Sequence, residues 1–192
     1  MEKKGLIVLI VLALMLILFS AVFFISSSRG KTKQKDKVSY LGDTTAVSVD
    51  LEKISVTIYF ISENDGLLYP EERDIFDDHQ LDIRARQVIY ELLKGSLNGL
   101  VTPFPEETKL RELYVTEEGT AYVDFTREIK ENHLYGSSAD ISTVYCVVNS
   151  LTQNFEEIKK VFILIDGSEK ETLGGHIDLS RPFVPRKDLI VR

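Results

Sequence analysis

Residues Gly5 to Ile25 form an unbroken apolar run without a charged side chain. It contains 21 residues, and Ser20 carries its only hydroxyl group. A helix of this length would rise about 31 Å, close to the thickness of the hydrocarbon core of a bilayer. The sequence therefore predicts a single transmembrane helix over about residues 5–25, within an N-terminal membrane anchor of residues 1–28.

The same stretch could instead be a signal peptide that is cleaved. Such peptides have an apolar region of about 7–15 residues followed by small residues. Small residues do follow at Ser26–Ser28, but the longer apolar run favours a retained helix. A lipid anchor would need a cysteine directly after the run. Because the only cysteine is Cys146, lipoprotein processing is not expected.

The charges on either side of the run disagree about its orientation. Two lysines precede it, whereas Arg29 and four lysines of residues 31–37 follow it. The positive-inside rule alone would place the carboxyl side in the cytoplasm. Lysines before a long apolar run, however, resemble an export signal. Charge therefore leaves the orientation open.

The rest of the chain is acidic. Residues 1–37 carry a net charge of +5 and the whole chain −7, which leaves −12 for residues 38–192. An acidic domain repels phosphate backbones, so a nucleic-acid partner is not expected. The composition of residues 29–50 predicts a basic and polar linker. Their basic part could lie against anionic lipid headgroups or act as a spacer.

Hydrophobic periodicity predicts one folded domain over residues 51–184, followed by a tail of residues 185–192. Period-two alternation and turn residues predict strands, and 3.6-residue periodicity predicts two helices. We expect strands at 54–61, 69–76, 110–115, 121–125 and 161–165, a short return strand at 170–172, and helices at 82–94 and 137–154. The apolar strand 161–165 should be central. This order predicts an α+β two-layer sandwich, with one mixed or antiparallel sheet and two helices on one face.

The sequence shows no convergent set of catalytic or ligand residues. His79, His133 and His176 fall in separate loops, without a second ligand at metal-binding spacing. Cys146 lies on the second helix and is expected to be a small buried hydrophobe. We therefore expect no enzyme activity, no cofactor and no metal. A hydrolase would need two carboxylates that converge in space, which a sequence cannot show.

Several stretches, in this order, resemble the GerMN domain, the sporulation and spore germination domain of bacterial envelope proteins. The resemblance covers about Ile54 to Pro182, and its most specific part is the stretch from Glu171 to Leu179. Ser96 and Ser150 depart from it, since the family often has proline and threonine there. The matching stretches are 56–60, 68–73, 91–95, 105–110, 119–125, 148–152, 161–167 and 171–179.

The resemblance implies a location and a class of function. Family members are typically exported and tethered to the membrane, often as lipoproteins. They look like interaction modules related to ring-building domains. This implies a single-pass protein of the cell membrane whose soluble domain lies outside the cytoplasm.

The implied role is non-catalytic: the domain would help to assemble or position an envelope complex. Its partner would be an envelope protein or a second copy, met by sheet-edge pairing or helix packing. The alternative is a receptor for a ligand or a cell-wall glycan. Candidate interaction residues are Glu71, Arg73, Asn149 and His176.

Overall fold

The computed structural model describes residues 52–133 and 136–192. The predicted transmembrane helix and nearly all of the predicted linker lie outside these residues. Within the described ranges no helix is both long and apolar enough to span a bilayer. The described residues form one compact unit.

Most predicted elements are present at close to the expected positions. The short helix α3 and the 3₁₀ helix η1 were not expected from the sequence. In chain order the elements are β1 (Lys53–Ile61), β2 (Leu68–Phe76), α2 (Leu81–Leu93), β3 (Leu110–Val115), β4 (Thr120–Phe125), α3 (Glu128–Glu131), α4 (Ser137–Asn154), β5 (Lys160–Ile165) and η1 (Lys187–Leu189).

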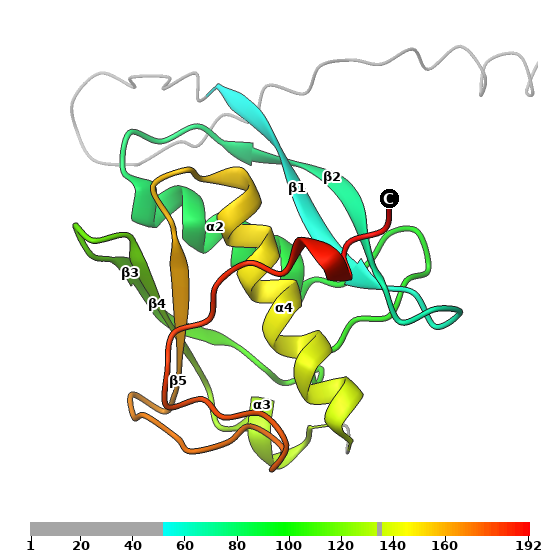
Figure 1. Cartoon of the computed structure of the whole chain (residues 1–192). Coiled ribbons are helices and arrows are strands. Elements are labelled where there is room, and N and C mark those ends of the chain that lie inside the picture. Colours follow the sequence, from blue (N-terminus) through cyan, green and yellow to red (C-terminus); the bar gives the residue numbers. More distant parts are fainter. Residues whose placement is uncertain (1–51, 134–135) are drawn as a thin grey trace, which may run out of the picture. The chain divides into compact units, whose positions relative to one another are not determined.

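The strands form two sheets rather than the single sheet expected from the sequence (Figure 1). β1 and β2 make an antiparallel hairpin, in register from Lys53 opposite Phe76 to Ile61 opposite Leu68. The second sheet has the order β3-β4-β5. β3 is antiparallel to β4, and β5 is parallel to β4. The α+β class is confirmed, but the prediction of one sheet is wrong.

The apolar strand β5 lies at the end of its sheet and not at its centre. Its outer edge is partly covered, because the C-terminal segment pairs with it at Val161 through Phe183. Residues 170–172 form no regular strand, and only an isolated bridge joins Thr172 to Asp178.

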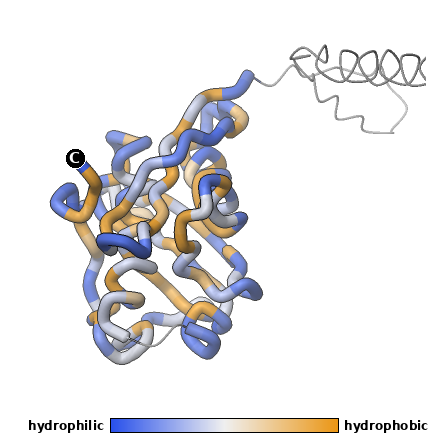
Figure 2. Tube along the Cα trace, turned by 90° about the vertical axis from the view of Figure 1, so that its right-hand side faces the viewer, coloured by the Kyte–Doolittle hydropathy of each residue, from blue (hydrophilic) through white to orange (hydrophobic). Residues whose placement is uncertain are grey.

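The two long helices lie against both sheets. α2 and α4 pack on each other, α2 contacts β1, β2 and β3, and α4 contacts β1 and β5. The prediction of both helices on one face of one sheet is therefore also wrong. Figure 2 shows apolar residues along the strands and helices, with hydrophilic residues in many of the turns. The largest fully buried side chains include Phe60, Ile89, Leu92, Leu113, Phe125 and Leu151. Burial of each stabilises the fold by about 1.5–3 kcal/mol.

Polar side chains of α4 hydrogen-bond to the outer edge of β1. The Asn154 amide accepts from Thr57 N at 2.8 Å and donates to Thr57 O at 2.6 Å. The Ser150 hydroxyl accepts from Tyr59 N at 3.0 Å. These bonds satisfy backbone groups that would otherwise be free to pair with another strand.

Side chains of α2 do the same for the second hairpin and for the end of β2. Arg86 Nε donates to Leu113 O at 3.1 Å, and Asp82 Oδ1 accepts from Val115 N at 3.0 Å, both on β3. The Gln87 amide exchanges two hydrogen bonds with the backbone of Phe76. Helix side chains thus cover parts of the outer edges of β1, β2 and β3.

The C-terminal segment joins the two sheets across α4 (red in Figure 1). Phe183 exchanges two backbone hydrogen bonds with Val161 of β5, at 2.7 and 2.9 Å. Val191 N then donates to Leu68 O of β2 at 3.0 Å. Residues 185–192, expected to be a tail, therefore pack onto the domain.

The thiol of Cys146 is completely buried in α4, as expected from the sequence. Burial raises its pKa well above the ordinary value, because the thiolate loses hydration. We therefore expect no reaction with a maleimide or a disulfide reagent in the native chain, and one equivalent in concentrated guanidinium. Stoichiometric labelling of the native chain within minutes would contradict the buried position.

Candidate interaction site

Glu71 and Arg73 lie on the inner face of the β1–β2 hairpin. Successive side chains of a strand point to opposite faces, so these two share a face with the buried Ile75. Glu71 is 3% exposed and Arg73 is 9% exposed. Glu71 Oε2 lies 2.6 Å from Arg73 Nη2. The pairing is required, since an isolated buried charge is very costly.

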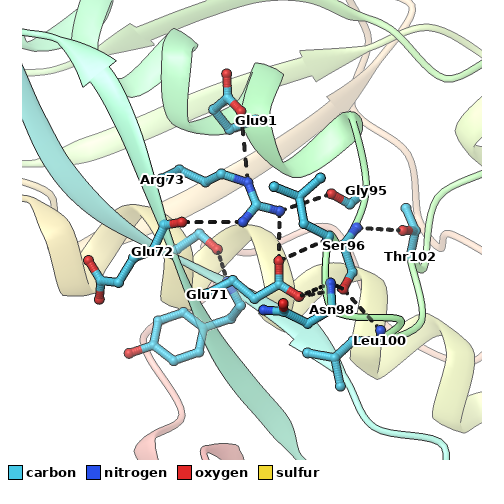
Figure 3. Close-up of polar contacts among 12 residues, drawn as sticks. Glu71, Glu72, Arg73, Glu91, Gly95, Ser96, Asn98, Leu100 and Thr102 are labelled. Carbon is cyan, nitrogen blue, oxygen red and sulfur yellow. Dashed lines mark hydrogen bonds and ion pairs between the residues drawn. The ribbon is translucent and has the colours of Figure 1, made fainter. Parts of the chain in front are cut away.

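The Glu71 carboxylate also holds the loop that follows α2 (Figure 3). It accepts from the Ser96 hydroxyl, from Leu97 N at 3.1 Å and from Asn98 N at 3.3 Å. Arg73 Nη2 donates to Gly95 O at 3.2 Å. The loop is therefore fixed to β2 by one buried ion pair.

These contacts also set the protonation of Glu71. Burial alone would raise its pKa, but hydrogen bonds from Ser96 and Leu97, with the bond and charge of Arg73, lower the pKa below its usual value overall. The carboxylate is thus ionised at neutral pH. The loop that this carboxylate holds carries Leu97, which is 78% exposed.

Asn149 is buried in α4, away from the Glu71–Arg73 pair. Its Oδ1 accepts from Arg186 N at 3.0 Å, and its Nδ2 donates to Arg186 O at 3.1 Å. The Asn149 amide thus bonds both backbone groups of Arg186, as a neighbouring strand would. Asn149 therefore fastens the C-terminal segment and presents no free polar group to a ligand.

Replacing Asn149 by alanine is expected to lower the free energy of unfolding by about 2–3 kcal/mol, because two backbone groups of Arg186 lose their partner. Denaturant unfolding measures the change. Gln153, exposed on the same helix, is the control, and its alanine variant should change stability by less than about 0.5 kcal/mol. Equal effects of the two variants would contradict the fastening role.

His176 has an exposed side chain, and its backbone is bound to Asp140. Asp140 Oδ2 accepts from Gly174 N and His176 N, each at 3.0 Å. Its other oxygen, Oδ1, lies 3.3 Å from Nδ1 of His133. Asp140 is fully buried and anchors the loop that carries His176.

Asp140, His133 and Thr143 stand in the order of a hydrolytic triad, since His133 Nε2 lies 2.9 Å from Thr143 Oγ1. All three side chains are buried. The Thr143 hydroxyl also lies 3.0 Å from Pro103 O and 2.9 Å from Ala139 O. A carbonyl oxygen only accepts, so the hydroxyl donates its proton there. The arrangement is a buried anchor with no accessible nucleophile.

The four sequence-predicted residues therefore lie in three separate places. Only Glu71 and Arg73 come together, and only the side chain of His176 is exposed. In the described part of the chain no three His, Cys, Asp or Glu side chains are grouped as metal ligands would be.

A groove at the end of α2 was not expected from the sequence. It has a volume of about 600 Å³ and is lined by Tyr90, Leu93, Lys94, Thr108, Lys109 and Leu110. The available signal was Tyr90, an aromatic residue outside the apolar face of the predicted helix. Nothing in the sequence singles out Thr108.

Comparison with known proteins supports the family resemblance. The model of the Germane family, described as sporulation and spore germination, matches residues 57–171. The chain belongs to the Germane family. The match runs from within β1 past the end of β5. No curated protein matches the chain.

Solved structures show the same fold. The first GerMN domain of the sporulation protein GerM from Bacillus subtilis is 25% identical, with a TM-score of 0.52, over 70% of this chain and 99% of that one. The tandem GerMN domains of GerM give 23% identity and a TM-score of 0.54, over 71% and 48%. A candidate lipoprotein from Clostridium perfringens is 25% identical, with a TM-score of 0.50, over 71% of this chain and 89% of that one. This chain thus matches about half of the tandem protein.

Proposed function

We propose that the chain is a non-catalytic, membrane-anchored module outside the cytoplasm, where it helps to assemble or position an envelope complex. The Germane match over residues 57–171 carries this proposal. The lipoprotein description of one similar structure supports a place in the envelope. The apolar run Gly5–Ile25 supplies the anchor.

The geometry of the polar residues supports an interaction role over a catalytic one. The buried charges Glu71, Arg73 and Asp140 are all committed to internal partners. They order loops, and all three residues are buried. Rigid loops and helix faces are the features that protein partners recognise at low entropic cost.

The covered strand edges favour helix and loop surfaces over sheet-edge pairing. Asn154, Ser150 and Arg86 occupy backbone groups that an added strand would need. The remaining stretch of β2 carries Pro70, and Glu72 and Asp74 are exposed along it. Proline and charge are common devices against edge pairing.

The orientation can be tested with alkaline phosphatase fused after Lys37. The enzyme folds only outside the cytoplasm, where its disulfides form. We expect an active fusion. A fusion that is stably expressed but inactive would contradict an extracytoplasmic domain.

The interaction role can be tested by crosslinking the full chain in intact cells. A discrete adduct with an envelope protein or a second copy is expected. Recovery of the monomer alone, with several crosslinkers of different reach, would remove the main support for the proposal.

The glycan-receptor alternative has less support, since Glu71, Arg73 and Asn149 are buried. It requires the exposed His176 to contribute directly. Cosedimentation of the full chain with purified peptidoglycan would support the alternative only if His176→Ala abolishes it and His79→Ala does not.

A further inference from the structure

α2 packs along β3 (Figure 1), and side chains of α2 hydrogen-bond to the backbone of β3 along the seam between them. Asp82 bonds Val115 N at one end, and Arg86 bonds Leu113 O in the middle. At the other end, where α2 finishes and β3 begins, the seam opens into the groove of about 600 Å³.

The lining of this groove is mainly apolar, and one of its residues, Thr108, has a buried hydroxyl without a partner in the described part of the chain. Thr108 is 5% exposed, and its Oγ1 makes no hydrogen bond within the described residues. A buried hydroxyl normally finds a partner. If the Thr108 side chain rotates toward the groove, a hydrogen-bonding group of a ligand would supply one.

The rim of the groove is basic, although the domain is acidic. Lys94 and Lys109 line it, and Lys109 has no ion-pair partner among the described side chains. Lys94 also contacts Glu91 on the same helix. Tyr90, on the α2 side, is 49% exposed. A half-exposed tyrosine next to an apolar pocket is typical of protein interfaces.

We propose that this groove receives one large apolar side chain of a partner protein, together with a carboxylate beside it in the partner's chain. The apolar side chain fills the space between Tyr90 and Leu110. The carboxylate faces Lys109, and a polar group of the same segment bonds Thr108. Charge complementarity selects a carboxylate to face the two lysines of the rim. The net charge of −12 on residues 38–192 disfavours a second copy as its source, because two such domains repel each other.

This proposal rests on the proposed interaction function and names its surface. The test places a photoreactive benzoylphenylalanine at position 90 or at position 114 of the full chain in intact cells. Tyr114 is the matched control, because it is a tyrosine of similar exposure, 46%, on the strand beside α2. We expect an adduct from position 90 only. Its partner peptide should contain a large apolar residue next to Asp or Glu.

Two variants test the chemistry of the groove. Lys109→Glu should lower the adduct yield at position 90 about two- to fivefold, whereas the same change at the exposed Lys187 should not. Thr108→Val should lower the yield roughly two- to tenfold. Its melting temperature should be unchanged or higher, because the variant removes an unpartnered hydroxyl. A merely structural role of Thr108 predicts the opposite change in melting.

The outcomes separate this proposal from the wider one. An adduct from position 114 alone would leave the interaction function standing and overturn the groove as its surface. An adduct between two copies at position 90 would overturn the partner assignment. A yield at position 90 that neither variant lowers would overturn the proposed chemistry. If neither position gave an adduct, and general crosslinkers gave none either, the result would count against the interaction function itself.

Discussion

Replacing Glu71 by alanine is expected to lower the free energy of unfolding by about 3–5 kcal/mol. The change leaves the Arg73 guanidinium buried without its carboxylate, 2.6 Å away in the native chain. It also removes the acceptor of Leu97 N and Asn98 N in the loop after α2. Removing one partner of a buried charge pair costs more than the pair contributes, because the remaining charge stays desolvated.

The neighbouring residue supplies a control for this prediction. Glu72 is exposed on the same strand and bonds the hydroxyls of Ser55 and Thr57. Its alanine variant should cost less than about 1 kcal/mol, as exposed polar contacts usually do. Denaturant unfolding compares the two variants. If Glu71→Ala lowered the free energy of unfolding no more than Glu72→Ala does, the buried Glu71 would not be what holds the loop in place.

Glu71→Gln keeps an acceptor but removes the charge, so it should be intermediate. It also tests the lowered pKa of Glu71. A carboxyl whose folded pKa lies below its ordinary value of 4.5 contributes fully above that value. The contribution is lost as the pH falls through the folded pKa. Below pH 4.5 the native chain should therefore lose stability faster than the glutamine variant does. Parallel pH profiles of the two chains would contradict the shift.

Local sequence patterns predict the elements well because local physics determines them. The alternation in β1 and the 3.6-residue spacing of Val88, Ile89 and Leu92 are determined by which face is buried. The number of sheets depends on contacts far apart in the chain. The bonds from Asn154 to Thr57 span 97 positions, and no local pattern reports them.

The burial of the candidate site residues could be predicted in part from the sequence. Glu71 and Arg73 alternate with exposed residues in phase with Ile75, so the period of the strand places them on its inner face. The two departures from the family pattern also have roles. Ser96 donates its hydroxyl to Glu71, and Ser150 accepts from Tyr59 N. The groove could not be predicted from the sequence, because it depends on how α2 and β3 pack against each other.

Replacing Asp140 by alanine is the second change with a large expected effect, about 2–4 kcal/mol of unfolding free energy. The variant leaves Gly174 N and His176 N without their acceptor, and it leaves the buried His133 without its carboxylate. Amide hydrogen exchange at Gly174 and His176 should become faster. Asp178 is the control: it lies exposed in the same loop and bonds Ser180. Its alanine variant should leave both amides protected.

The close approach of Gly174 to Asp140 gives this prediction a second, independent readout. A Cβ at position 174 would clash with Asp140 Oδ1, and the buried carboxylate has no free space into which to move. Gly174→Ala should therefore destabilise the native chain by about 1–3 kcal/mol. In the Asp140→Ala background the same change should cost much less, because the clashing atoms are absent. A coupling energy of at least about 1 kcal/mol between the two sites is expected from the four unfolding curves. Additive effects would mean that the loop is not held against Asp140.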